Sequence, residues 1–222
     1  MTGISQGALK SCVSTGQRFI IRLNAITLTN PLTDLSQNKI LISPIDITDL
    51  TLLEQLGEEV ASIFGYPVNI CNLLDNIEFA YSPERHQYNS TLILEKLSET
   101  APADYLKVIA ICKKDLYIPI LTYVFGEAQL NGRSCIVSIY RLKDTKAVLN
   151  PEGIFAERLV KEAVHELGHT FNIRHCSDNS CVMHYCHSLN DVDNKKRRMC
   201  RYCNIMFEDE KKRIEKICKK IY

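Results

Sequence analysis

The sequence has almost no net charge, no long apolar run, and little glycine or proline. Its 27 Lys and Arg residues against 26 Asp and Glu residues give a formal charge of +1, which excludes a global electrostatic attraction to nucleic acid or to an anionic membrane. No uninterrupted apolar stretch approaches the roughly 20 residues that a membrane-spanning helix needs. With 9 Gly and 7 Pro in 222 residues, of which 45% are hydrophobic, the composition excludes collagen-like and disordered chains and is sufficient for a core.

The first residues also lack the basic start and long apolar core that mark a signal peptide. We therefore expect a cytoplasmic protein, in which thiols stay reduced and clustered cysteines bind metal more often than they form disulfides. A disulfide framework is the alternative. We expect no membrane contact, and a monomer in preference to an oligomer.

Composition and periodicity divide the chain into three parts. Residues 1–16 are polar and are expected to form a weakly ordered extension. Residues 17–172 are expected to form an N-terminal subdomain with a mixed sheet and a long helix at its end. Residues 173–222 are expected to form a small C-terminal subdomain that ends in a helix.

The pattern of apolar residues predicts alternating strands and helices. Short apolar runs bounded by turn residues predict strands, and helical spacing behind capping residues predicts helices. The expected strands are 39–45, 68–74, 105–112, 121–128 and 134–142, and the expected helices are 51–64, 89–98, 154–171 and 208–221, with a further apolar run at 18–28. Asn131-Gly132 predicts a hairpin turn between the last two strands. The expected fold class is α+β, a mixed twisted sheet packed with helices.

The side chains that commonly bind metals are concentrated in one short segment. The chain has 10 Cys and 6 His, and five of each lie in the 39 residues from His165 to Cys203. This segment begins within the predicted helix 154–171, whose apolar stripe faces the core while His165 and His169 lie on another side. The helix can therefore present these two histidines to a cleft.

The pentapeptide His165-Glu166-Leu167-Gly168-His169 has the form H-E-x-x-H. Histidines four residues apart on a helix lie one turn apart on the same face, so both imidazoles can bind one Zn²⁺. Glu166 lies at the flank of this pair, where it can take a proton from a zinc-bound water. A chance match of the motif and a solvated helix face both stay open as alternatives.

A third histidine, His175, follows six residues after the second. It can reach the same metal only if the helix ends and the chain turns back. A glycine usually makes such a turn. Asn172 holds that place here, and Asn is the non-glycine residue that best tolerates the left-handed conformation. Three neutral imidazoles with one open position form the ligand set of a catalytic zinc.

The pattern from His165 to His175 resembles the metzincin clan of zinc metallopeptidases. The chain departs from the clan at Asn172, where the clan has Gly. The resemblance implies a methionine in a tight turn beneath the zinc, and Met183 matches it, with simple core packing as the alternative. Astacins and serralysins, two other groups of the clan, have a Met-x-Tyr whose hydroxyl helps to stabilise the oxyanion. By that resemblance Tyr185 is a possible oxyanion stabiliser.

Within the clan, the chain is similar to the archaemetzincins. The motif that carries this resemblance is His175-Cys176-x-x-x-x-Cys181-x-Met183, followed by Cys200-x-x-Cys203. Residues 85–90, 125–128 and 160–164 also resemble that family, so the resemblance covers about residues 39–206. It implies a metzincin-like fold, peptidase activity, a catalytic zinc, and a second, structural zinc held by the four cysteines.

The four cysteines also fit a structural zinc site by their own chemistry. Cys176 and Cys181 form one pair, Cys200 and Cys203 form the other, and four thiolates make a closed tetrahedral site. The binding energy of such a site becomes folding energy for a segment too short to form its own core. Free buried thiols, or a different set of four that includes Cys186, stay open.

The remaining residues of the segment are less informative. Nothing in the sequence assigns a role to Cys186, His184 or His187. The basic run from Lys195 to Arg198 could indicate a zinc module that binds nucleic acid. A four-residue charge run is more often a solvated loop, however, and no aromatic residue is interleaved with it. We expect a solvated loop and no nucleic-acid partner.

The sequence therefore predicts a zinc metallopeptidase that acts on a peptide or protein substrate. Two Zn²⁺ ions are expected per chain, one catalytic and one structural, and Glu166 is expected to activate the water on the catalytic ion. The strand before the predicted hairpin turn would form the edge of the cleft, where an extended substrate pairs with it. The alternative is a zinc-stabilised protein that binds a peptide or RNA and carries a vestigial peptidase site.

Overall fold

The computed structural model describes residues 12–14, 38–143 and 150–221. Of the predicted extension it describes only Cys12–Ser14, which forms strand β1, and the apolar run 18–28 lies outside the described residues. No helix among these residues is long and apolar enough to cross a membrane.

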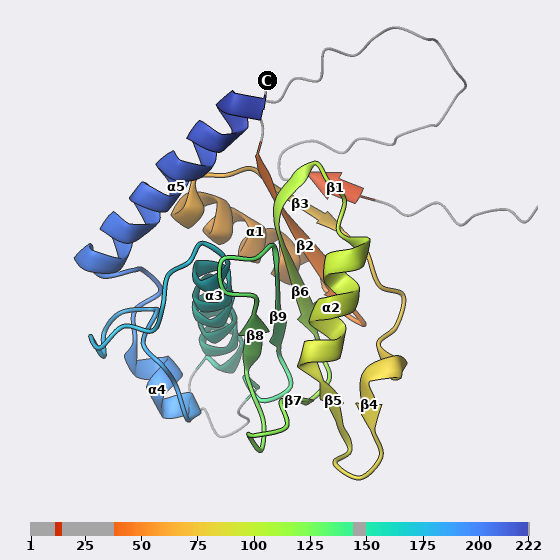
Figure 1. The fold of residues 1–222 in the computed structure, drawn as a ribbon. Coiled ribbons are helices and arrows are strands. Elements are labelled where there is room, and N and C mark those ends of the chain that lie inside the picture. The colour runs from red at the N-terminus through yellow and green to blue at the C-terminus, as the bar shows by residue number, and fades with distance from the viewer. Residues whose placement is uncertain (1–11, 15–37, 144–149, 222) are drawn as a thin grey trace, which may run out of the picture.

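A six-stranded mixed sheet forms the centre of the molecule (Figure 1). In spatial order its strands are β1 (Cys12–Ser14), β3 (Val68–Cys71), β2 (Lys39–Ile45), β6 (Tyr105–Cys112), β9 (Ser134–Ser138) and β8 (Gly126–Ala128). The four inner strands run parallel, while β1 and β8 pair antiparallel at the two ends of this order. The strand β8 is therefore an edge strand in the described part of the chain, and it belongs to the hairpin that Asn131-Gly132 predicts.

Helices cover both faces of this sheet (Figure 1). The helices α1 (Leu50–Phe64) and α3 (Pro151–Thr170) pack on one face, and α2 (Ser90–Thr100) packs on the other. Successive residues of a strand point to opposite faces, so Ile40 of β2 joins the core under α1 and α3 while Leu41 joins the core under α2. The predicted α+β class, with a mixed sheet packed with helices, is confirmed.

Local signals explain where the first two helices begin and end. Asp49 caps α1 by accepting a hydrogen bond from the backbone N–H of Leu52 at 3.0 Å, and Gly65 ends the helix with a φ of 72°. Asn89 caps α2 in the same way, by accepting from the N–H of Thr91 at 3.0 Å. The predicted helix boundaries agree with the structure to within a few residues for this reason.

Short elements account for most of the differences from the prediction. A second sheet of three strands, β4 (Tyr81–Ser82), β5 (Gln87–Asn89) and β7 (Leu116–Tyr117), a 3₁₀ turn η1 (Glu78–Ala80) and the helix α4 (Leu189–Asn194) were not predicted. The predicted strands 68–74, 121–128 and 134–142 are wrong at one end, because the strands cover only 68–71, 126–128 and 134–138, and Val124 forms an isolated bridge with Leu116. Strands of two or three residues are too short for a hydrophobic period to mark them.

The last helix, α5 (Arg201–Ile221), begins seven residues before the predicted start at residue 208. The carbonyl of Cys200 accepts a hydrogen bond from the backbone N–H of Asn204 at 2.9 Å. The second cysteine pair is thus built into the first turn of the helix, although the predicted helix starts after it. The proposed division of the chain at residues 172 and 173 stays a prediction.

Candidate active site and metal centres

The structure brings the three predicted histidines together at the base of a cleft. The ligand atoms of His165, His169 and His175 all lie within 4.8 Å of one another. His165 and His169 come from the C-terminal half of α3, and His175 comes from the segment that follows it. The cleft has a volume of about 290 Å³, and β8 lines one of its sides.

Backbone carbonyls orient the two helical histidines. Nδ1 of His165 lies 2.8 Å from the carbonyl oxygen of Val182, and Nδ1 of His169 lies 2.7 Å from that of Ile173. A carbonyl oxygen can only accept, so each Nδ1 carries the proton and donates. Each Nε2 therefore keeps its lone pair, which is the tautomer that a metal ligand needs.

Asn172 makes the turn that brings His175 back toward the helix. It has a φ of 64°, in the left-handed region, so the predicted use of Asn in place of Gly in this geometry is confirmed. The N–H of Ile173 donates to the carbonyl of Gly168 at 3.1 Å, and the N–H of Asn172 donates to the backbone carbonyl of His169 at 2.9 Å. These two hydrogen bonds form a Schellman motif, which satisfies carbonyls in the last turn of α3.

The three histidines fit a zinc ion. Nε2 of His165 and Nε2 of His169 lie 3.1 Å apart, and two nitrogens bound tetrahedrally to one zinc are separated by about 3.3 Å. Neither nitrogen carries a proton in the tautomer that the carbonyls select, so they have no hydrogen bond to share. A cation bound between them would offset the repulsion of the two lone pairs.

Burial keeps these imidazoles neutral. Burial, reinforced by the charge of Lys195, lowers the pKa of His165 well below its usual value. Burial also lowers the pKa of His169 to about 4, although the hydrogen bond to Ile173 opposes it. The pKa of His175 is lowered by burial as well, although its side chain is the most exposed of the three. Neutral imidazoles are the form that binds metal.

Glu166 lies in the wall of the cleft beside these histidines and is only 6% exposed. Burial, followed by the negative charge of Glu162, raises the pKa of Glu166 well above its usual value. A raised pKa makes a carboxylate a stronger proton acceptor. General bases work best when their pKa lies near the operating pH, and burial moves the pKa of Glu166 in that direction.

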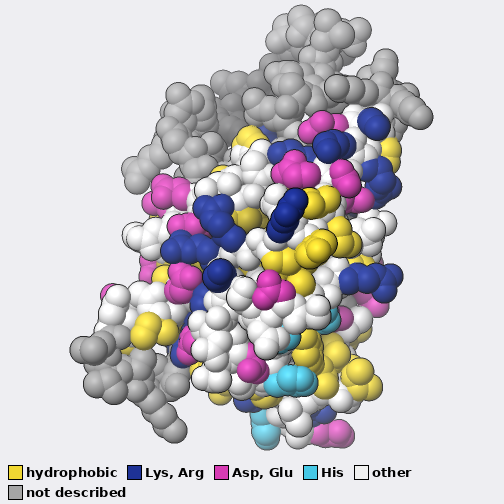
Figure 2. Space-filling view, turned by 90° about the vertical axis from the view of Figure 1, so that its left-hand side faces the viewer, with side chains coloured by type: hydrophobic (Ala, Val, Ile, Leu, Met, Phe, Trp, Pro, Cys, Tyr) yellow, Lys and Arg dark blue, Asp and Glu magenta, His cyan; other side chains and the backbone are white. Residues whose placement is uncertain are grey.

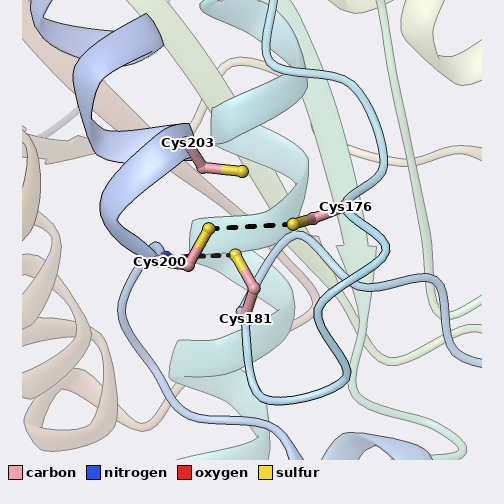
Figure 3. Close-up of side chains that lie close together, drawn as sticks. All are labelled: Cys176, Cys181, Cys200 and Cys203. Carbon is pink, nitrogen blue, oxygen red and sulfur yellow. Dashed lines mark hydrogen bonds between the residues drawn. The ribbon is translucent and has the colours of Figure 1, made fainter.

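The four predicted cysteines form a second cluster (Figure 3). Their sulfur atoms all lie within 4.8 Å of one another. Sγ of Cys176 and Sγ of Cys200 are 3.7 Å apart, and two thiolates bound tetrahedrally to one zinc are separated by about 3.8 Å. The N–H of Cys200 also donates to Sγ of Cys181 at 3.2 Å. The cluster therefore fits zinc, and Cys186 does not belong to it.

Hydrogen bonds between Cys176 and the segment 183–184 link the two clusters. The N–H of Cys176 donates to the carbonyl of Met183 at 2.9 Å, and Nδ1 of His184 donates to the carbonyl of Cys176 at 2.9 Å. Since Cys176 directly follows His175, these bonds hold the third histidine against the segment 183–184. They also show what His184 contacts, which the sequence left open.

Met183 lies directly beneath α3 and is fully buried. A Cβ added to Gly168 would lie 2.5 Å from its sulfur atom, so the helix and Met183 can approach this closely only because residue 168 is glycine. The resemblance to metzincins pointed to Met183, but nothing in the sequence pointed to Gly168. A lone glycine inside a helical pattern gives no signal for such a contact.

Lys195 corrects the expectation of a solvated basic loop. Its ammonium group is buried in the cleft wall, 2.8 Å from the equally buried carboxylate of Glu162. Burial alone would lower the pKa of Lys195, but the charges of Glu162 and Cys186 and the hydrogen bonds to them together outweigh burial and raise the pKa. Arg197 is also paired, at 2.8 Å from Glu59. Lys195 and Arg197 are thus held against α1 and α3 by acidic side chains, whereas Lys196 and Arg198 are exposed as expected for a solvated loop.

The helix α4, which precedes this run, is fastened to α3 by charged side chains. Arg158 contacts both carboxylate oxygens of Asp193 at 2.7 Å, and Nζ of Lys161 donates to the carbonyl of Val192 at 3.0 Å. Charge-assisted hydrogen bonds of this kind are stronger than neutral ones. They keep the segment between the two cysteine pairs against the helix that carries His165.

Tyr185, Cys186 and His187 line the cleft after Met183. The ring of Tyr185 lies edge-on to those of His175, at 5.0 Å, and His187, at 4.5 Å. The hydroxyl of Tyr123, which also lines the cleft, donates to the carbonyl of His187 at 2.9 Å. Tyr185 is 38% exposed, so its hydroxyl can reach a molecule in the cleft.

Comparison with known proteins identifies the family. Residues 61–209 match peptidase family M54. The chain belongs to this family. An archaemetzincin from Archaeoglobus fulgidus is 38% identical over 166 residues, which cover 74% of this M54 chain and 96% of that protein. An archaemetzincin from Methanopyrus kandleri is 42% identical over 136 residues, which cover 61% of this chain and 74% of that protein.

Solved structures agree with the family. The crystal structure of archaemetzincin from M. kandleri superposes with a TM-score of 0.69 at 34% identity and covers 80% of this chain and 97% of that chain. That from A. fulgidus gives a TM-score of 0.64 at 33% identity and covers 76% and 99%. The resemblance to archaemetzincins is thereby confirmed, and the M54 chain is a zinc metallopeptidase.

Proposed function

We propose that this M54 peptidase hydrolyses peptide bonds with Glu166 as the general base and with a zinc ion held by His165, His169 and His175. The single observation that carries this proposal is the convergence of the three imidazoles within 4.8 Å of one another, in a cleft that Glu166 also lines. A zinc ion there would polarise the scissile carbonyl and lower the pKa of a bound water.

The protein's own groups carry the proton transfers in this proposal. The carboxylate of Glu166 accepts a proton from the attacking water and then delivers it to the nitrogen of the leaving amine. Its raised pKa suits both steps, because a weaker acid holds the proton between them. The carbonyls of Val182 and Ile173 keep His165 and His169 in the correct tautomer throughout.

The substrate is a peptide or protein, and it pairs with β8 as an extended strand. Two facts support this part of the proposal. The strand β8 lies at the end of the main sheet in the described part of the chain, and residues 126–128 line the cleft beside Glu166. Main-chain hydrogen bonds to such an edge bind peptides with little dependence on their side chains.

A second zinc ion is proposed at the four cysteines, with a structural role. Cys176, Cys181, Cys200 and Cys203 supply four sulfur ligands, so the site has no open position for a substrate. The two buried cysteines, Cys181 and Cys203, anchor it in the core. This gives two zinc ions per chain, with different tasks.

Tyr185 is proposed to stabilise the negative charge that develops on the carbonyl oxygen. Replacing Tyr185 with Phe removes one hydroxyl and is expected to lower kcat tenfold or more, with zinc content unchanged. Steady-state kinetics on one peptide measure this. The matched control is Tyr202→Phe on α5, whose side chain is 79% exposed and does not line the cleft. If Tyr185→Phe turns over as fast as the wild type, the hydroxyl has no catalytic role.

The second candidate function is a zinc-stabilised binding protein with a vestigial peptidase site, which recognises a peptide or RNA. Incubating the zinc-loaded protein with a diverse peptide mixture separates the two. We expect new peptides whose ends define cleavage sites, detected by mass spectrometry, and no new peptides after a chelator removes the zinc. Peptides that are retained but never cut would favour the binding protein.

A cytoplasmic location and a monomeric state complete the proposal. Cysteine ligands must be reduced to bind zinc, which is the condition of the cytoplasm, and this supports the location although Cys71 is disulfide-bonded. Nucleic acid is not proposed as a partner. On the face in Figure 2, Lys and Arg side chains are interspersed with Asp and Glu, whereas nucleic-acid binding needs a basic patch.

A further inference from the structure

The edge strand β8 touches the proposed general base at one residue, Gly126. A Cβ added to Gly126 would lie 2.7 Å from Cγ and 2.8 Å from Oε1 of Glu166, and 2.6 Å from the carbonyl oxygen of Ile136. Real Cβ atoms do not approach other atoms this closely. A glycine within a strand often marks a place where another group packs against the backbone, and here those groups are the carbonyl of Ile136 and the carboxylate arm of Glu166.

The strand cannot move away to make room for a side chain. Gly126 pairs with Val137 of β9, and the carbonyl of Phe125 accepts a hydrogen bond from the N–H of Ser138 at 2.8 Å. On the other face of the sheet, the carboxylate of Glu127 accepts hydrogen bonds from the hydroxyls of Ser90 and Thr91 at the start of α2. The strand β8 is thus held from two directions.

The helix α3 is equally fixed opposite Gly126. Its residues Ala163, Val164 and Leu167 are fully buried in the core, and its last turn is tied to the β8–β9 turn by a hydrogen bond from the N–H of Asn131 to the carbonyl of His169 at 3.0 Å. Because both elements are fixed, a side chain at residue 126 would have to displace the side chain of Glu166.

We propose that Gly126 is a positioning residue for catalysis, because the space of its missing side chain holds the carboxylate of Glu166 in the orientation that proton transfer requires. This inference rests on the proposed role of Glu166 as general base. It adds that the strand which pairs with the substrate also sets the position of Glu166. Substrate binding and the orientation of the base therefore depend on the same backbone, that of β8.

The test is Gly126→Ala in the full-length, zinc-loaded protein. We expect kcat to fall tenfold or more while KM changes less than threefold and the zinc content stays at the wild-type value, since no metal ligand is touched. Ala128→Gly, which makes the reverse one-carbon change two residues further along β8, measures how sensitive the strand is in general. A kcat for Gly126→Ala within twofold of the wild type would overturn the proposal.

A double-mutant cycle gives a readout that does not depend on activity. Gly126→Ala is expected to lower Tm, and to lower it less in a Glu166→Ala background, where Cγ and Oε1 are gone. An equal loss of Tm in both backgrounds would place the conflict at Ile136 and contradict the proposal. If Gly126→Ala alone fails to fold, folding of the double variant supports the proposal, and failure of both overturns it.

Failure of the inference and failure of the proposed function look different in these experiments. If Glu166→Ala keeps full activity, the general-base assignment is wrong whatever Gly126→Ala does. If Glu166→Ala is inactive while Gly126→Ala matches the wild type in kcat, Glu166 is the base and Gly126 does not position it.

Discussion

Replacing Glu166 with alanine is expected to lower kcat by about 10²–10⁴-fold and to leave both zinc sites filled. The side chain is not part of the three-histidine or the four-cysteine group, so its loss removes no ligand. What is lost is the proposed acceptor of the proton from water. Steady-state kinetics, together with zinc analysis by atomic spectroscopy on the same preparation, check both halves of this expectation.

A control on the same helix separates this effect from damage to α3. Glu157→Ala also replaces a glutamate of α3, but Glu157 lies outside the cleft, 3.4 Å from Arg197. We expect its kcat to stay within twofold of the wild type. Peptidase activity that persists in highly purified Glu166→Ala protein would falsify the general-base assignment.

Loss of the four-cysteine site is expected to have the second large effect. Binding of a structural zinc contributes on the order of 10 kcal/mol in small zinc-binding peptides, which is comparable to the whole stability of many domains. Cys203→Ser should therefore lower the zinc content from two ions per chain to one or fewer. It should also lower Tm by more than about 10 °C, since residues 176–200 lose the metal link that ties them to α5.

Cys203→Ser should also weaken the three-histidine site, although Cys203 belongs to the four-cysteine cluster. Cys176 directly follows His175, and its N–H bonds to the carbonyl of Met183 at 2.9 Å, so release of Cys176 frees the third zinc ligand. We expect kcat/KM to fall by about 100-fold or more, a loss of about 3 kcal/mol in transition-state stabilisation.

Two further variants make the zinc count decisive. His165→Ala should retain one zinc, at the cysteines, and Cys186→Ser should retain two, because Cys186 lies in the same segment but outside the cluster. One zinc per chain in the wild type and in His165→Ala alike would instead support the binding-protein alternative. Loss of a zinc in Cys186→Ser would mean that a different set of four cysteines binds the metal.

The grouping of the three histidines could be predicted from the sequence because their spacing is local. Two histidines four residues apart share a helix face by the period of the helix alone, and the structure places their Nε2 atoms 3.1 Å apart. The turn that returns His175 needs only one left-handed residue, and Asn172 supplies it with a φ of 64°. The strands Lys39–Ile45 and Tyr105–Cys112 were predicted at their observed bounds, because buried parallel strands are continuous apolar runs.

Other features depended on contacts between distant parts of the chain. Lys195 belongs to a basic run that is typical of a solvated loop, yet it is buried because Glu162, far from it in sequence, lies 2.8 Å away. The start of α5 was misplaced because the hydrogen bond from Asn204 to Cys200 extends the helix into the cysteine pair. Charge and turn patterns describe a residue's own neighbours, and neither carries information about an ion pair or a metal cluster formed across the fold.

By itself the sequence predicted the chemistry proposed for this protein: which side chains group as metal ligands, which carboxylate stands beside them, and which helix carries them. These follow from residue type and from the 3.6-residue period, which act over a single turn. Only the tertiary structure decided what holds that chemistry in place: the carbonyl of Val182 on His165, the burial of Lys195, and the close approach of Gly126 to Glu166. Such contacts join residues that are distant in the sequence, and their geometry depends on how the sheet and helices pack.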